Sequence, residues 1–271
     1  QSLGTYQSVS DRMRAPIDLA PRNPYTLSLA SPVLLAPGCE VRGVETTGVG
    51  AVATRTATLH TRGGPAPVFR PTPAGLVVTG IPSVSIRTLL KEEARRWQRA
   101  PRPTLVSLQG SVDEVAEMAG LLESVEGVAG LLVHAEEDVR AVMAAARGQT
   151  PLPLLALLDQ GPRLAADVVA VVQAGADALV VAAPPPAAAG ADEIVEGYLL
   201  GPAVFPLTLR AVVEARAAGE IPVVALGGIA TGAFARTALQ AGATAVMVDA
   251  ARWGDPFAAV RIARELDEVG G

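Results

Sequence analysis

Two kinds of segment alternate along the chain from about residue 32 to its end. Short runs rich in Val, Leu and Ala have the length of strands, and longer amphipathic stretches separate them. Strands buried on both faces read as continuous apolar runs, as these do. The pattern therefore predicts eight strands, at residues 32–38, 51–58, 104–110, 130–135, 153–159, 178–184, 222–228 and 245–251.

The segments between these runs carry helix signals. Residues 111–125 open with Ser111 and, three positions on, Glu114, which is the spacing of a capping box. Residues 163–176 and 231–243 both reach a glycine shortly before the next strand, as helix C-termini prefer. We expect the last helix to begin at Asp255-Pro256, a capping residue followed by a proline in the first turn.

Eight strands, each followed by a helical segment over about 240 residues, predict an α/β fold of the (β/α)8 TIM-barrel class. A doubly wound open sheet is the alternative, but no G-x-G-x-x-G follows the first strand. Within residues 1–31, a polar, proline-broken arm, the PIDL and TLSL segments are predicted to form a two-stranded cover under the barrel. Residues 59–80, rich in Pro and Gly, predict a β-type excursion after strand two. The predicted domains are a short N-terminal arm at 1–15 and a single barrel at 16–271.

The composition narrows the function classes. Half of the 271 residues are apolar and only 18% are charged, which excludes intrinsic disorder. Because 22 basic residues face 27 acidic ones, we expect no nucleic-acid partner. A single cysteine excludes a disulfide framework and a zinc site built on thiolates, and no metal is expected. Lys91 is the only lysine and Asn23 the only asparagine. The composition therefore disfavours mechanisms that need a Schiff-base lysine or several asparagine side chains.

No segment predicts a membrane span, because polar residues and three consecutive prolines interrupt the longest apolar stretch, at about 168–189. The first residues lack the apolar core of a signal peptide and an initiator Met. From these features we expect a trimmed or processed protein with a cytoplasmic location.

Five segments together resemble a known family. They are PVLLAPGC (32–39), GAVATRTATLHTRGGPAPVFRPTPAGLVVTGIPS (50–83), LVSLQGSVDEV (105–115), LLGPAVFPLTLRAV (199–212) and IPVVALGGIATGAFARTALQAGATAVMVDAARWGDPFA (221–258). In order and spacing, the chain resembles the class 1 dihydroorotate dehydrogenases over about residues 16–265. The resemblance implies FMN at the C-terminal mouth of the barrel, with its phosphate on backbone N–H groups after strands seven and eight. If FMN is bound, the resemblance places against it Ala36, Gly38, Arg55, Ser107, Gly201, Gly227, Gly228, Asp249 and Ala250.

The same comparison shows where the chain departs from the family pattern. The positions that differ are Arg55 for the lysine of T-K-T, Ser107 for the asparagine of V-N-I, Leu157 for the lysine of V-K-L, Asp249-Ala250 for G-T, and Val77 to Ser83 for N-x-x-G-x-x-N. Arginine keeps the charge of lysine but not its compact geometry. A carboxylate beside a phosphate about 4 Å away is unfavourable by about 1–4 kcal/mol in a partly screened site.

The family's L-N-x-S-C-P-N and the long loop that bears the cysteine base have no counterpart here. Val133-His134-Ala135 runs directly into Glu136 and a helix. We therefore expect no catalytic residue for dihydroorotate oxidation.

Charged residues gather at the predicted mouth, at or near the C-terminal ends of strands: Glu40, Arg55, His134, Asp159 and Asp249. One hypothesis is an acid–base site made from His134 and a carboxylate. The other is mutual neutralisation of Arg55 and the acids. We expect Arg55 and Asp249 to meet across the mouth as a guanidinium–carboxylate pair.

The remaining candidates have structural interpretations. Gly227-Gly228 predicts either a tight turn or a live phosphate site, and the turn is favoured. Cys39 is expected to be a partly buried small residue without a redox role. His60 is expected in solvent, and the cluster of Arg95, Arg96, Arg99 and Arg102 is expected at a solvated helix C-terminus.

Three functions follow as hypotheses. The first is a non-catalytic structural or interaction subunit with no cofactor, acting with a protein partner or as a homo-oligomer. The alternative is an FMN-dependent oxidoreductase with an altered substrate, because flavin binding can rest on backbone contacts. The third is a different small-molecule enzyme that uses the charged mouth.

Overall fold

The computed structural model describes residues 17–41, 44, 46–62, 67–79, 83–136, 138–190 and 193–269. The predicted N-terminal arm at 1–15 lies outside these ranges, as do parts of the excursion, residues 63–66 and 80.

Eight parallel strands close into a barrel, as the apolar pattern predicts. Their spatial order is the order along the chain, and the third strand pairs with the fourth to complete the ring. The strands are β3 (Val33–Leu35), β4 (Ala51–Ala53), β9 (Thr104–Gly110), β10 (Val128–Ala135), β11 (Leu154–Asp159), β12 (Ala178–Ala183), β15 (Val223–Leu226) and β16 (Ala245–Val248). Every residue of β3, β4, β12, β15 and β16 is buried, which accounts for their continuous apolar sequence.

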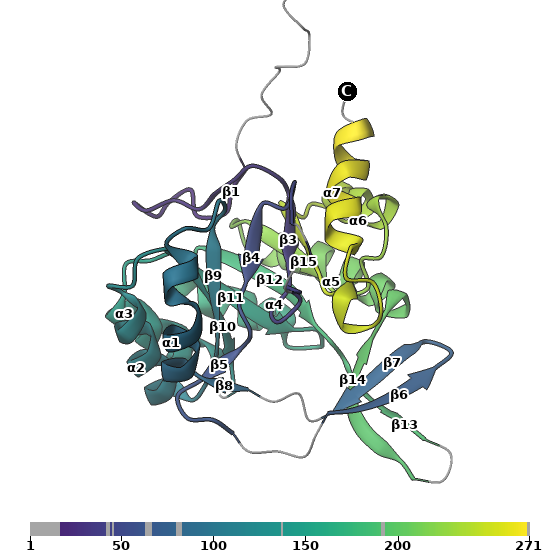
Figure 1. Cartoon of the computed structure of the whole chain (residues 1–271), viewed down its shortest axis with the longest axis horizontal. Coiled ribbons are helices and arrows are strands. Elements are labelled where there is room, and N and C mark those ends of the chain that lie inside the picture. Colours follow the sequence, from purple (N-terminus) through teal and green to yellow (C-terminus); the bar gives the residue numbers. More distant parts are fainter. Residues whose placement is uncertain are drawn as a thin grey trace, which may run out of the picture.

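Helices surround this barrel (Figure 1). They are α1 (Ile86–Trp97), α2 (Val112–Leu122), α3 (Val139–Gln149), α4 (Leu164–Gln173), α5 (Phe205–Ala218), α6 (Gly232–Gln240) and α7 (Ala258–Val269), with the 3-10 turns η1 (Pro202–Val204) and η2 (Ala250–Arg252). The capping box of Ser111 and Glu114 is present at α2. The predicted start of the last helix is wrong. Asp255 instead accepts the Phe257 N–H at 3.0 Å in a turn, and α7 begins at Ala258.

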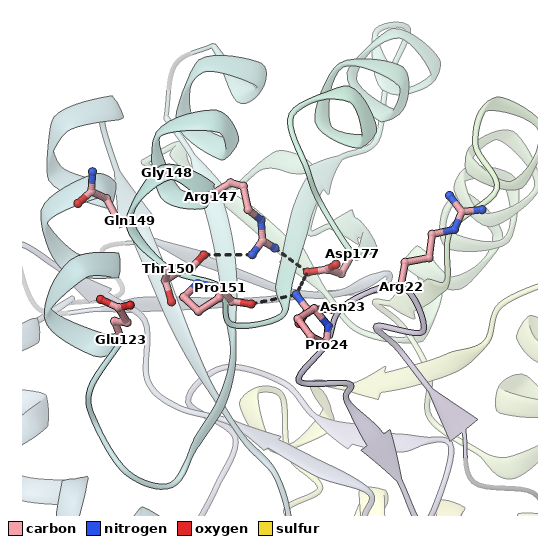
Figure 2. A pocket seen from close by; sticks show the side chains of 10 residues that line it. All are labelled: Arg22, Asn23, Pro24, Glu123, Arg147, Gly148, Gln149, Thr150, Pro151 and Asp177. Atoms are coloured by element: carbon pink, nitrogen blue, oxygen red, sulfur yellow. Dashed lines mark hydrogen bonds and ion pairs between the residues drawn. The ribbon is translucent and has the colours of Figure 1, made fainter.

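A short antiparallel pair, β1 (Ile17–Asp18) and β2 (Ser28–Leu29), forms the predicted two-stranded element before the barrel. The loop between them lies against the N-terminal ends of the barrel strands. There Asn23 Nδ2 donates to Pro151 O at 3.0 Å and to Asp177 Oδ2 at 3.1 Å, and the Arg147 guanidinium donates to the same Oδ2 at 2.7 Å. Figure 2 shows these side chains along an open hollow of about 750 Å³. This end of the barrel is the one opposite the predicted mouth.

Within the excursion predicted at 59–80, β6 (Val68–Thr72) and β7 (Gly75–Thr79) make an antiparallel hairpin, so this segment is β-type as predicted. The strand predicted at 51–58 is divided into β4 and β5 (Ala57–Thr58), and β5 pairs with β8 (Val84–Ser85) at the edge of the barrel sheet. The sequence did not predict β13 (Pro186–Ala189) and β14 (Val195–Leu200), which pair with the hairpin in the order β13-β14-β7-β6. This four-stranded sheet projects from the barrel at the lower right of Figure 1.

Among the residues that the model describes, none of the helices has both the length and the apolarity that crossing a membrane requires.

Candidate functional site

The C-terminal ends of the barrel strands bring the predicted FMN-side residues to one mouth. Ala36 follows β3 and donates its N–H to Val248 O at the end of β16 at 3.1 Å. Ser107 lies within β9, and Asp249 and Ala250 directly follow β16. All four are buried, so they belong to the floor of the mouth rather than to its rim.

Ser107 stands where the family pattern has an asparagine, and its hydroxyl makes a hydrogen bond within the protein. Its Oγ lies 3.1 Å from the Thr56 hydroxyl, and its N–H donates to Thr54 Oγ1 at 3.2 Å. These bonds join β9 to the segment after β4. The Ser107 hydroxyl therefore has a partner in this chain without any ligand.

Three glycines of the predicted site meet at the junction of β15 and α5. Gly201, Gly227 and Gly228 have φ angles of +128°, +111° and +70°, which favour glycine. A Cβ on Gly228 would lie 2.5 Å from Phe205 N and 3.0 Å from Gly201 O. Thr208 Oγ1 donates to Gly227 O at 3.0 Å. The close approach to Phe205 N thus requires a glycine at position 228, and the positive φ angles agree with a tight turn after β15.

We expect Gly228→Ala to lower the free energy of unfolding by about 3 kcal/mol, because the new Cβ meets backbone atoms that cannot rotate away and the residue keeps a positive φ. Urea unfolding followed by circular dichroism measures the change. Gly148, with no atom within 4 Å of a built Cβ, is the matched control. A Gly228→Ala protein as stable as Gly148→Ala would contradict the packing explanation.

The predicted pair of Arg55 and Asp249 is wrong. Arg55 Nη2 lies 2.7 Å from Glu92 and 3.2 Å from Glu93, both on α1, so its side chain points out of the barrel toward that helix. Those carboxylates hold the pKa of Arg55 above its ordinary value. Arg55 lines a cavity of about 260 Å³ between α1 and the ends of β3 and β4, which Glu40 and Arg96 also line. The sequence placed Arg55 at a strand end correctly but did not show which way it turns.

Asp249 lies at the floor of the mouth and is only 2% exposed. Its Oδ1 accepts from Trp253 Nε1 at 3.4 Å. Burial raises the pKa of its carboxyl, and the nearby Arg252 guanidinium opposes that rise. Cys39 is equally buried, more so than the partly buried residue that was expected, and burial raises the pKa of its thiol to about 12.

Arg252 is the functional candidate that the sequence did not single out. It ends η2, the 3-10 turn directly after Asp249, and its Nη2 donates to Pro37 O. The same nitrogen lies 3.7 Å from the position that a Cβ on Gly38 would take. The guanidinium therefore covers the end of β3. An arginine four positions after the end of the last strand was the available signal.

His134 and Asp159 lie together at the ends of β10 and β11. His134 Nε2 is 3.6 Å from Asp159 Oδ1, and the ring lowers the pKa of this carboxyl from its ordinary value. Asp159 is 75% exposed, so solvent weakens the pair. β10 ends at Ala135 and α3 begins at Val139, so the chain passes from strand to helix with no room for a long loop.

The other charged candidates pair at the surface. Arg96 donates to Glu40 Oε1, and Arg102 donates to Thr46 O. Arg95 and Arg99 are exposed at the end of α1, and His60 is exposed, as predicted. Arg62 bridges Glu114, at 3.0 Å, and Glu136. Glu40, Glu114 and Glu136 therefore pair with Arg96 or Arg62 rather than with Arg55, whereas Asp159 pairs with His134 and Asp249 with Trp253.

Comparison with known proteins assigns the family. The family model described as dihydroorotate dehydrogenase matches residues 180–269. A relative from Desulforudis audaxviator, the dihydroorotate dehydrogenase B (NAD(+)) catalytic subunit, is 34% identical, with 89% of each chain covered. Proteins of the same name from Pelobacter propionicus and Citrifermentans bemidjiense are 31% and 30% identical, with 89% of this chain and 90% of each relative covered. The chain belongs to the dihydroorotate dehydrogenase family.

Members of this family are flavin enzymes, so we compared the mouth with what FMN requires. A phosphate dianion requires N–H donors and cations, and the buried Asp249 carboxylate stands where the family resemblance puts the phosphate. The ring requires free space over β3, and the Arg252 guanidinium lies on Pro37 O there. Arg55, at the position of a flavin-side lysine, is turned toward α1. These three side chains differ from the phosphate and ring contacts that the family resemblance implies.

Proposed function

We propose that this member of the dihydroorotate dehydrogenase family is a non-catalytic subunit that keeps the barrel and acts by association with another protein or with a second copy of itself. The observation that supports the proposal is the Asp249 side chain, which is buried after the end of β16, where the family resemblance implies the phosphate. Burying a phosphate dianion beside a buried carboxylate costs free energy that neither group recovers.

The retained glycines do not oppose this proposal. Gly228 closely approaches Phe205 N, at the start of α5, and Gly201 O, and Gly227 closely approaches Thr208 of α5. Their presence in the sequence therefore does not require a bound phosphate.

We expect the purified chain to lack the near-ultraviolet and blue absorbance of a flavoprotein, and to bind FMN with a Kd weaker than about 1 µM in equilibrium dialysis. Asp249→Gly, which restores the family's residue, is expected to strengthen FMN binding because it removes the buried negative charge. Asp167→Gly, at a distant carboxylate on α4, is the control for an equal change of net charge. A parent chain that holds FMN at micromolar Kd or tighter would sink this proposal.

An FMN-dependent oxidoreductase with an altered substrate is the second candidate. The names of the relatives favour it over the first, because each is a catalytic subunit aligned over 89% of this chain. Retention of Ala36, Gly38 and the glycine turn after β15 also favours it, since these would contact a flavin through the backbone. The dialysis experiment separates the two candidates directly.

A further inference from the structure

The outer surface of α1 carries a continuous row of positive charge. Arg87, Lys91 and Arg95 are exposed at every fourth position of the helix, and Arg99 is exposed in the turn that follows it. Residues at this spacing lie above one another on one helix face. Within the part of the chain that the structure describes, none of the four side chains has a hydrogen-bond or ion-pair partner. We call these four residues the basic ridge.

Local helix stability does not account for the basic ridge. Arg87 lies in the first turn of α1, which has no acidic residue, and the positive end of the helix dipole disfavours a cation there. Like charges four positions apart also repel one another. The two glutamates of α1 do not offset these charges, because both pair with Arg55. The ridge therefore has an unfavourable electrostatic energy in the isolated chain, and an acidic surface in contact with it would remove that energy.

The neighbouring helix α2 carries the opposite charge on its outer surface. Both α1 and α2 pack against β5, and they lie on the same side of the barrel (Figure 1). Asp113 and Glu117 are exposed one turn apart on α2, and Glu123 and Glu126 are exposed at its end and just beyond it. Among the described residues, none of these four carboxylates has a side-chain partner. We call them the acidic ridge.

The two ridges match each other in charge and in length. Each has four charges, and the helices that carry them have 12 and 11 residues. Side by side, they form a surface that is complementary to itself: after a two-fold rotation, α1 of each copy faces α2 of the other, so the same contact forms twice. The net charge of −5 on each copy opposes this contact only weakly, because salt screens charges that are more than about 10 Å apart.

We propose that the basic ridge and the acidic ridge dock two copies of this chain onto each other, as a two-fold dimer held mainly by charge. This inference rests on the proposed function, because a subunit that acts by association needs a surface for its partner. It goes further by naming the partner, a second copy of the chain, and the two helices that receive it.

Sedimentation velocity of the parent chain tests the dimer. We expect a dimer at about 20 mM salt and a monomer at about 500 mM salt, because salt screens ion pairs at a surface. Arg87→Glu/Lys91→Glu/Arg95→Glu reverses the basic ridge. We expect this variant to dimerise with a Kd at least about a hundredfold weaker, since like charges then face each other. Circular dichroism checks its fold, and the single variant Lys91→Glu replaces it if it does not fold.

Reversal of the acidic ridge supplies the second half of the test. Glu117→Lys/Glu123→Lys/Glu126→Lys is also expected to be a monomer on its own. A mixture of the two reversed variants is expected to form a one-to-one dimer at low salt, because each reversed ridge then faces a ridge of opposite charge on the other chain. Damage to the fold or to solubility would not produce association that appears only on mixing.

Arg163→Glu/Arg210→Glu/Arg264→Glu is the matched control. It changes the net charge as much as reversal of the basic ridge does, at exposed arginines outside both ridges. We expect it to dimerise like the parent and not to associate with the variant whose acidic ridge is reversed. Three outcomes would overturn the inference: a parent that is a monomer at low salt, a dimer that survives reversal of the basic ridge, or reversed variants that stay monomeric when mixed.

These results are separate from FMN affinity. A parent that binds FMN while the reversed variants associate on mixing would refute the proposed function and leave the dimer surface in place. A flavin-free parent that stays monomeric would overturn the dimer surface and leave the proposed function with a different partner.

Discussion

Asp177→Ala is expected to lower the free energy of unfolding by about 3 kcal/mol. One oxygen of this carboxylate, Oδ2, accepts from Arg147 at 2.7 Å, from the Leu154 N–H at 2.8 Å and from Asn23 at 3.1 Å. Its side chain is 12% exposed and that of Arg147 is 27% exposed, so little water can replace it. Removal leaves a partly buried guanidinium without its counter-charge and a strand N–H without its acceptor.

Urea unfolding of the parent, Asp177→Ala and Asp177→Asn measures this effect. Asp177→Asn keeps an acceptor oxygen but loses the charge, so we expect an intermediate loss. Asp167→Ala is the matched control, because Asp167 pairs at 3.5 Å with the exposed Arg163. Its expected loss is below about 1 kcal/mol. Equal losses in the two alanine variants would show that the cluster does not hold the β1–β2 loop against the barrel.

The sequence predicted the barrel because burial on both faces leaves a simple signature. β9 occupies residues 104–110 as predicted, and β12 ends one residue before the predicted boundary at 184. The start of α7 was wrong for a local reason. Asp255 and Pro256 are residue types that are common at helix N-termini. Here the Asp255 carboxylate accepts the Phe257 N–H in a turn that precedes the helix.

Long-range pairing was the part of the fold that sequence patterns could not give. β13 reads Pro-Ala-Ala-Ala, which has none of the β-branched residues that mark strands, and it forms a strand because β14 lies beside it. β14 in turn pairs with β7, more than a hundred positions earlier. Only the tertiary arrangement connects the excursion after β4 with this later hairpin.

The same limit applies to the candidate site. The sequence predicted that four residues at strand ends lie near one mouth: Arg55, His134, Asp159 and Asp249. The close approach of His134 to Asp159 agrees with that prediction. Whether a long side chain turns inward or outward depends on the helix beside it. Arg55 turns to Glu92 and Glu93 on α1, whereas Arg252, at the end of η2, reaches Pro37 O after β3.

Dihydroorotate oxidation by this chain is expected to be undetectable, because the loss of a general base alone commonly lowers the rate by about 10²–10⁴. The family resemblance implies a base on a long loop after the fourth strand, and here α3 begins at Val139 directly after β10. His134 is the one imidazole near that position, and Asp159 is its neighbour at 3.6 Å. Asn23, the only asparagine, lies at the opposite end of the barrel, where it bonds to Asp177, so no amide of that type can orient the substrate.

Orotate formation, measured with added FMN and an electron acceptor, tests this expectation. The protein should come from a host that lacks its own dihydroorotate dehydrogenase. The Desulforudis audaxviator catalytic subunit, prepared in the same way, is the positive control. Orotate produced by the parent and lost in His134→Ala would identify His134 as a base and refute the non-catalytic proposal. We expect the parent chain to form no more orotate than His134→Ala or buffer alone. That result would mean that the His134 imidazole acts only as a partner of Asp159.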